Sequence, residues 1–129
     1  MTPMTTDTLA AVITAVSDIF ECDPATLSGS TRLMLDLPCE SIDLLEVASR
    51  MAQRYHVRVD DDAIFLRSLR ARVEQEAGSD PASVIAAAYP WLRPGRAQAL
   101  AAALSDPAPL VTLDDIADYM TMAARARGK

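Results

Sequence analysis

The chain has 129 residues, half of them hydrophobic but only six aromatic, and its formal net charge is −6. This length suits a single domain over residues 1–129, with a modest core of Leu, Ile, Val, Met and Ala. Residues 1–62 hold 11 acidic and 4 basic side chains. This acidic half argues against nucleic acid as a partner, because phosphates would be repelled, and it favours proteins with basic docking surfaces.

Cysteine usage and hydropathy exclude further classes. The two cysteines, Cys22 and Cys39, form no CxxC motif, and with the single histidine they are too few for a metal cluster or a disulfide framework. No apolar run is long enough to span a membrane, and the N-terminus lacks a basic stretch followed by an apolar region. We therefore expect a cytoplasmic, monomeric protein without a metal site.

The first predicted helix has Thr6 or Asp7 as its cap and runs to about Phe20, with apolar residues at the helical period. Residues 21–40 hold two prolines, a glycine and many Ser, Thr and Asp residues, which indicates a long structured loop. We expect four leucines to hold this loop on the core: Leu27, Leu33, Leu35 and Leu37.

A second helix is predicted over residues 41–55, with Ser41 at its start. Asp43 and Glu46 favour this start because carboxylates in the first turns oppose the positive end of the helix dipole. Taken alone, Ser41 is most simply a helix cap. The apolar residues that follow at helical spacing are Ile42, Leu45, Ala48, Met51, Ala52 and Tyr55.

The remaining chain is predicted to be helical as well. Asp60–Asp62 begin a short third helix, and further helices are expected over residues 66–77, 79–89 and about 95–104. The final helix is capped by Thr112, with Asp115 three residues on in a capping-box arrangement. The residues expected on its core face are Leu113, Ile116, Ala117 and Met120.

Five segments occur in a fixed order around Ser41. They are Asp23–Leu27, Thr31–Leu33 followed by Asp36-Leu37, Ile42–Glu46, Tyr55–Asp62 and Val111–Met120. In this order they resemble the first loop, the second helix, the bend with its acidic run and the last helix of the acyl carrier protein family. The resemblance covers residues 5–65 and 110–124. It implies an all-α, acyl-carrier-like four-helix bundle, with residues 66–109 as a helical insertion between the third and last helices.

The resemblance also implies a function. In the family, the serine at the start of the second helix carries a covalent 4′-phosphopantetheine, and the matching residue here is Ser41. The chain would then be a carrier and not an enzyme, presenting acyl thioesters in a specialised fatty-acid, lipid or polyketide-like pathway. The implied partners are a phosphopantetheinyl transferase and acyl-loading, condensing or acyl-transfer enzymes. An aminoacyl or peptidyl carrier is a close variant.

A partner-binding surface is expected around this serine. Two departures from the family pattern concern it: Glu40 stands where the family usually has Asp, and Arg50 and Arg54 stand where the family is typically acidic. We therefore expect a dedicated set of partner enzymes. The residues expected to bind partners are Asp36, Leu37, Glu40, Ile42, Asp43, Leu45, Glu46, Arg50 and Arg54.

Other functions remain open at this point. The chain could be an unmodified carrier-like scaffold or regulatory subunit that binds partner proteins. Hydrolysis by Ser41 with His56 is disfavoured, because the GxSxG motif and alternating strands and helices are absent. The insertion could be a solvated decoration, or a docking platform or cover for which Trp91, Leu92 and Arg93 are the residues to test.

Overall fold

The computed structural model describes residues 4–127, and side-chain burial is described from Thr8 onward. All regular structure in this part of the chain is helical, apart from one isolated antiparallel bridge between Arg32 and Thr112. The predicted all-α class is therefore confirmed. The helices are α1 (Met4–Phe20), η1 (Pro24–Thr26), α2 (Leu33–Asp36), α3 (Ser41–Tyr55), α4 (Asp61–Ile64), α5 (Leu69–Gln75), α6 (Pro81–Ala88), α7 (Arg96–Ala102) and α8 (Leu113–Arg127).

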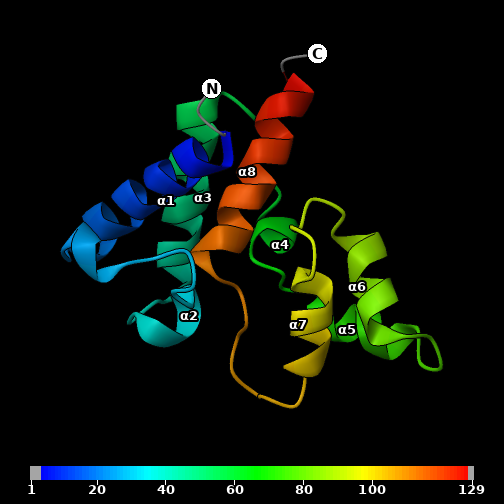
Figure 1. Ribbon diagram of the computed structural model, residues 1–129. Coiled ribbons are helices and arrows are strands. Elements are labelled where there is room, and N and C mark those ends of the chain that lie inside the picture. Colours follow the sequence, from blue (N-terminus) through cyan, green and yellow to red (C-terminus); the bar gives the residue numbers. More distant parts are fainter. Residues whose placement is uncertain (1–3, 128–129) are drawn as a thin grey trace.

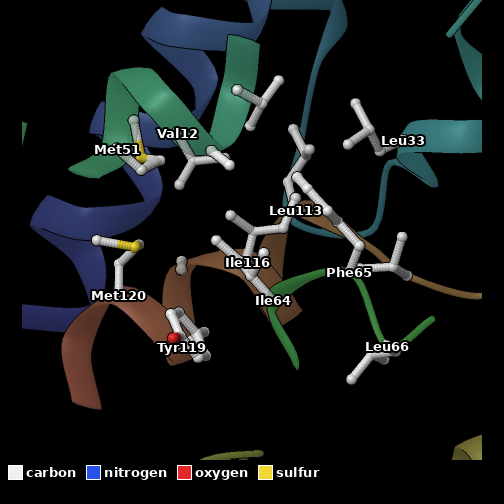
Figure 2. Close-up of a cluster of buried hydrophobic side chains, with 14 of the residues drawn as sticks. Val12, Leu33, Met51, Ile64, Phe65, Leu66, Leu113, Ile116, Tyr119 and Met120 are labelled. Carbon is white, nitrogen blue, oxygen red and sulfur yellow. The ribbon is translucent and has the colours of Figure 1, made fainter. Parts of the chain in front are cut away.

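Helices α1, α3 and α8 pack side by side, and α4 closes the bundle against α3 and α8 (Figure 1). Figure 2 shows the side chains that meet between them, with Val12 from α1, Met51 from α3 and Met120 from α8. The predicted core face of α8 is confirmed, because all four of its residues are buried. Removing these apolar side chains from water is the main driving force for assembling the bundle.

The start of α1 differs from the prediction. The helix begins at Met4, before Thr6 and Asp7, and it ends at Phe20 as expected. The side chains of Thr6 and Asp7, the proposed caps, lie outside the described residues. Its Val12 and Val16 are fully buried, which agrees with the predicted apolar face.

The loop that follows α1 is tied to the start of α8. The Leu33 N–H donates to the Val111 carbonyl at 3.2 Å, and the Asp114 N–H donates to the Gly29 carbonyl at 2.9 Å. A Cβ atom on residue 29 would clash with the Asp114 carboxylate, so a larger residue at this position would displace that side chain. These contacts place the loop, and α2 within it, on the bundle.

Residues 66–109, the predicted insertion, hold α5, α6 and α7. Helix α5 begins at Leu69 and not at residue 66 as predicted, because residues 65–68 form a turn in which Leu66 has a φ of +53°. Asp80 caps α6 with Pro81 in its first turn, as expected. Helix α6 packs against both α5 and α7 (Figure 1). Ile85 and Leu100 are buried in the same apolar cluster as the bundle residues, so the insertion is not a solvated decoration.

Two arginines of the insertion bind aspartates of α8. Arg93 Nε and Nη2 donate to Asp118 at 2.9 Å each, and Arg96 Nε and Nη2 donate to Asp115 at 2.8 Å each. Asp115 is only 1% exposed, and it also accepts the Thr112 N–H at 3.0 Å. The Asp115 N–H in turn donates to Thr112 Oγ1, which confirms the predicted capping box.

Replacing Arg96 with alanine tests how strongly the insertion is coupled to the bundle. Arg96→Ala leaves the buried Asp115 carboxylate without its counter-charge, so we expect the free energy of unfolding to fall by about 3–5 kcal/mol. Urea denaturation followed by circular dichroism measures this change.

Arg67→Ala is the matched control. Arg67 is exposed and forms no ion pair with any residue in 8–127, so its removal should change stability by less than about 0.5 kcal/mol. Equal effects of the two substitutions would contradict a structural role for the Arg96–Asp115 pair.

Candidate functional site

Ser41 is the first residue of α3, and Glu40 is the residue that caps the helix. The Glu40 N–H donates to Asp43 Oδ2 at 2.8 Å, and the Asp43 N–H donates to the Glu40 carbonyl at 3.0 Å. The reading of Ser41 as the cap is therefore wrong. Its side chain is exposed, and its hydroxyl forms no hydrogen bond with the described residues.

Backbone donors surround this free hydroxyl. Neither the Ser41 N–H nor the Ile42 N–H has a hydrogen-bond acceptor among residues 4–127. Both lie in the first turn of a 15-residue helix, where the helix dipole is positive. An anionic group attached to the serine oxygen would find two unpaired donors and a favourable potential here.

The segment before Ser41 is ordered by local hydrogen bonds. In α2, the Arg32 N–H donates to Asp36 Oδ2 at 2.8 Å, and the Arg32 side chain donates to the Pro109 carbonyl at 2.8 and 3.2 Å. Leu37 is half-buried and packs against the core. The serine is thus presented at the end of an anchored segment.

Three large apolar side chains are exposed near the start of α3. Leu35 is 49% exposed, Ile42 69% and Leu45 56%. Leu35 does not hold the loop on the core as predicted, because α2 turns it away from the buried Leu33. The predicted apolar stripe of α3 is also wrong at its first two positions, since its buried residues are Leu44, Val47, Ala48 and Met51.

Local contacts occupy most charged groups among the expected partner-binding residues. Asp36 and Asp43 accept backbone N–H groups, as described above. Arg50 bridges Glu46 at 3.0 Å and Asp18 of α1 at 3.2 Å. Arg50 and Arg54 are four residues apart, on one flank of α3, and both line a hollow of about 270 Å³ beside α1. The surface around Ser41 therefore combines these locally paired charges with the exposed side chains of Leu35, Ile42 and Leu45.

His56 lies too far from Ser41 to activate it. The two residues are at opposite ends of α3, which separates them by about 22 Å along the helix at 1.5 Å per residue. Catalysis by this pair is therefore excluded. Among the side chains of residues 8–127, no group of three or more His, Cys, Asp or Glu residues could hold a metal ion. No helix within residues 4–127 is long and apolar enough to cross a membrane.

Cys39, two residues before Ser41, is a poor nucleophile. Burial raises the pKa of its thiol from 9.0 to about 11, and the nearby Asp43 carboxylate adds to this shift. The thiol therefore stays protonated at neutral pH, and the thiolate is the reactive form. A thioester held near Ser41 would not be lost to this side chain.

The reactivity of Cys39 should depend on pH accordingly. At pH 8 the thiolate fraction is about one in a thousand, roughly a hundredfold below that of a thiol with the ordinary pKa. We expect alkylation by iodoacetamide, followed at Cys39 by peptide mass spectrometry, to be slow at pH 8 and to rise up to about pH 11. Asp43→Asn should move this profile to lower pH, since it removes the second cause of the shift. Fast labelling at pH 7 would contradict the assignment.

Comparison with known proteins gave one family. A family model described as a phosphopantetheine attachment site matches residues 10–75, which are 66 of the 129 residues and include Ser41. The match extends through α5 and stops before α8, so the predicted boundaries of core and insertion stay predictions. Neither the curated proteins nor the solved structures gave a match.

Proposed function

The chain belongs to the phosphopantetheine attachment site family, and from this premise we propose that Ser41 is its attachment residue and that its cargo is an acyl group. Domains of this family carry a covalently attached 4′-phosphopantetheine and serve as carriers. The thiol of that group holds the cargo as a thioester. The part played by this chain is to hold the group at an accessible position and to present it to successive enzymes, which raises the effective concentration of the cargo at each one.

The observation that carries the proposal is the state of the Ser41 side chain. Its hydroxyl is exposed and unbound, whereas a serine that served only as a cap would use its oxygen to accept a backbone N–H. The two free N–H groups of Ser41 and Ile42 suit the charge of a phosphodiester on that oxygen. The residues present at this position therefore fit the group.

The proposed pathway is a specialised fatty-acid, lipid or polyketide-like one. The apolar side chains of Leu35, Ile42 and Leu45 beside Ser41 offer a contact surface to a transferase and to acyl-handling enzymes. An aminoacyl or peptidyl cargo remains the variant within the same class. An unmodified scaffold is the alternative from a different functional class. The two functions are distinguished by whether Ser41 accepts the phosphopantetheinyl group.

Intact mass spectrometry tests the attachment residue directly. After incubation with coenzyme A and a broad-specificity phosphopantetheinyl transferase, the parent chain should gain the mass of one phosphopantetheinyl group. Ser41→Ala should gain nothing, because the acceptor oxygen is gone.

Ser49→Ala is the matched control, since Ser49 is an exposed serine two turns later on the same helix. It should be modified like the parent. No gain in the parent with several transferases would favour the unmodified scaffold, and a gain in Ser41→Ala would place the group on another residue.

A second test concerns partner recognition. We propose that the flank of α3 with Arg50 and Arg54 contacts acidic groups of dedicated partner enzymes. The double substitution Arg50→Glu with Arg54→Glu should lower kcat/KM for the acyl-loading enzyme of this carrier by roughly tenfold or more, because like charges would then face each other. The fold should persist, since the exposed pairs of Arg50 contribute only about 0–1 kcal/mol each.

Arg58→Glu changes the charge by the same sign on the bend after α3, where Arg58 is exposed. The kcat/KM of the acyl-loading enzyme for this variant should stay within about twofold of its value for the parent chain. If the double variant is loaded as fast as this control, then Arg50 and Arg54 take no part in docking.

A further inference from the structure

A groove along the C-terminal half of α8 is not explained by the carrier function. It has a volume of about 640 Å³ and separates the turn at residues 90–94 from the C-terminal half of α8. The start of α8 is bonded to residues 29–33, near α2, whereas the groove begins at Asp118 and follows the helix toward its C-terminal end. The groove residues used below are Trp91, Leu92, Asp118, Met122 and Arg125.

The floor of the groove is apolar and contains an unpaired donor. Trp91, Leu92 and Met122 are half-buried there. Edge-to-face contacts fix the indole ring, with its centroid 5.5 Å from that of Tyr89 and 5.2 Å from that of Tyr119. Trp91 Nε1 is buried without a hydrogen-bond partner. Such a donor is unusual, because a buried indole N–H normally has an acceptor.

The rim of the groove carries an uncompensated positive charge. Arg93 is neutralised by Asp118 at 2.9 Å and by Asp114 at 3.2 Å. Arg125 is exposed and forms no ion pair within residues 8–127. The groove therefore combines apolar contact area with a free guanidinium group, which calls for an anionic partner.

We propose that this groove is a second docking surface, which binds an acidic segment of a partner protein. An apolar side chain of the segment packs on Trp91, Leu92 and Met122, and a carboxylate of the segment pairs with Arg125. The groove is open and spans residues 118–126, about 12 Å of helix, which suits an extended or helical chain segment. Tryptophan and arginine are also the residues that most often anchor protein interfaces.

This surface differs in charge preference from the start of α3 around Ser41, where the exposed carboxylates of Glu40 and Glu46 favour basic partners. Its occupation needs no group on Ser41. The test therefore uses the full, unmodified chain, and its result is independent of whether Ser41 is the attachment residue.

Nuclear magnetic resonance can follow the groove directly, because Trp91 is the single tryptophan of the chain and gives one indole N–H signal. The probes are two synthetic amphipathic peptides of about 12 residues, one of Leu and Glu and one of Leu and Lys in the same pattern. The acidic peptide should shift the indole signal and the amide signals of residues 118–126. The basic peptide should bind at least tenfold more weakly.

Variants locate the contacts. Arg125→Glu should weaken binding of the acidic peptide by roughly tenfold or more, while the matched charge change Arg127→Glu, outside the groove lining, should alter it by less than about threefold. Equal binding of both peptides, or no difference between Arg125→Glu and Arg127→Glu, would overturn the proposal.

Discussion

The fork between Arg96 and Asp115 is the interaction on which the rest of the structure depends. One buried carboxylate accepts two N–H groups of the guanidinium and the N–H of Thr112, and the same guanidinium donates to the Leu110 carbonyl at 3.0 Å. The start of α8, the segment before it and the start of α7 are therefore held at a single point. Breaking a buried pair of this kind leaves an uncompensated charge, which is why it constrains the fold strongly.

The Arg96–Asp115 pair is connected to the candidate site through backbone hydrogen bonds. The start of α8 is bonded to residues 29–33, and α2 follows directly and leads to Ser41. The Ser41 hydroxyl can thus remain free of hydrogen bonds while the Ser41 backbone keeps a defined position. The neighbouring residues form the hydrogen bonds that hold this segment in place. The proposed attachment residue would need this combination of an accessible oxygen and a fixed backbone.

The sequence predicted the elements whose signals are local. The capping box of Thr112 and Asp115 acts within one helical turn, so its pattern was sufficient. The pairs of Arg93 and Arg96 with α8 join residues 19 to 25 apart, and no short-range pattern encodes them. Leu35 was misplaced for a related reason: in a loop a leucine is expected to anchor the chain, but a single turn of helix turned this one toward solvent.

The order of the helices along the chain also has a consequence for folding kinetics. Helices α1 and α8 are neighbours, and Thr8 and Thr121, hydrogen-bonded at 2.8 Å, are 113 residues apart. Pairing such distant segments is slow, because the loop-closure entropy is lost before the contact is gained. The helices of the insertion pack mainly on their sequence neighbours, so they can form early and shorten the loop that α8 must close. Early formation of these helices would thus reduce the closure cost that the length of the insertion adds to the pairing of α1 with α8.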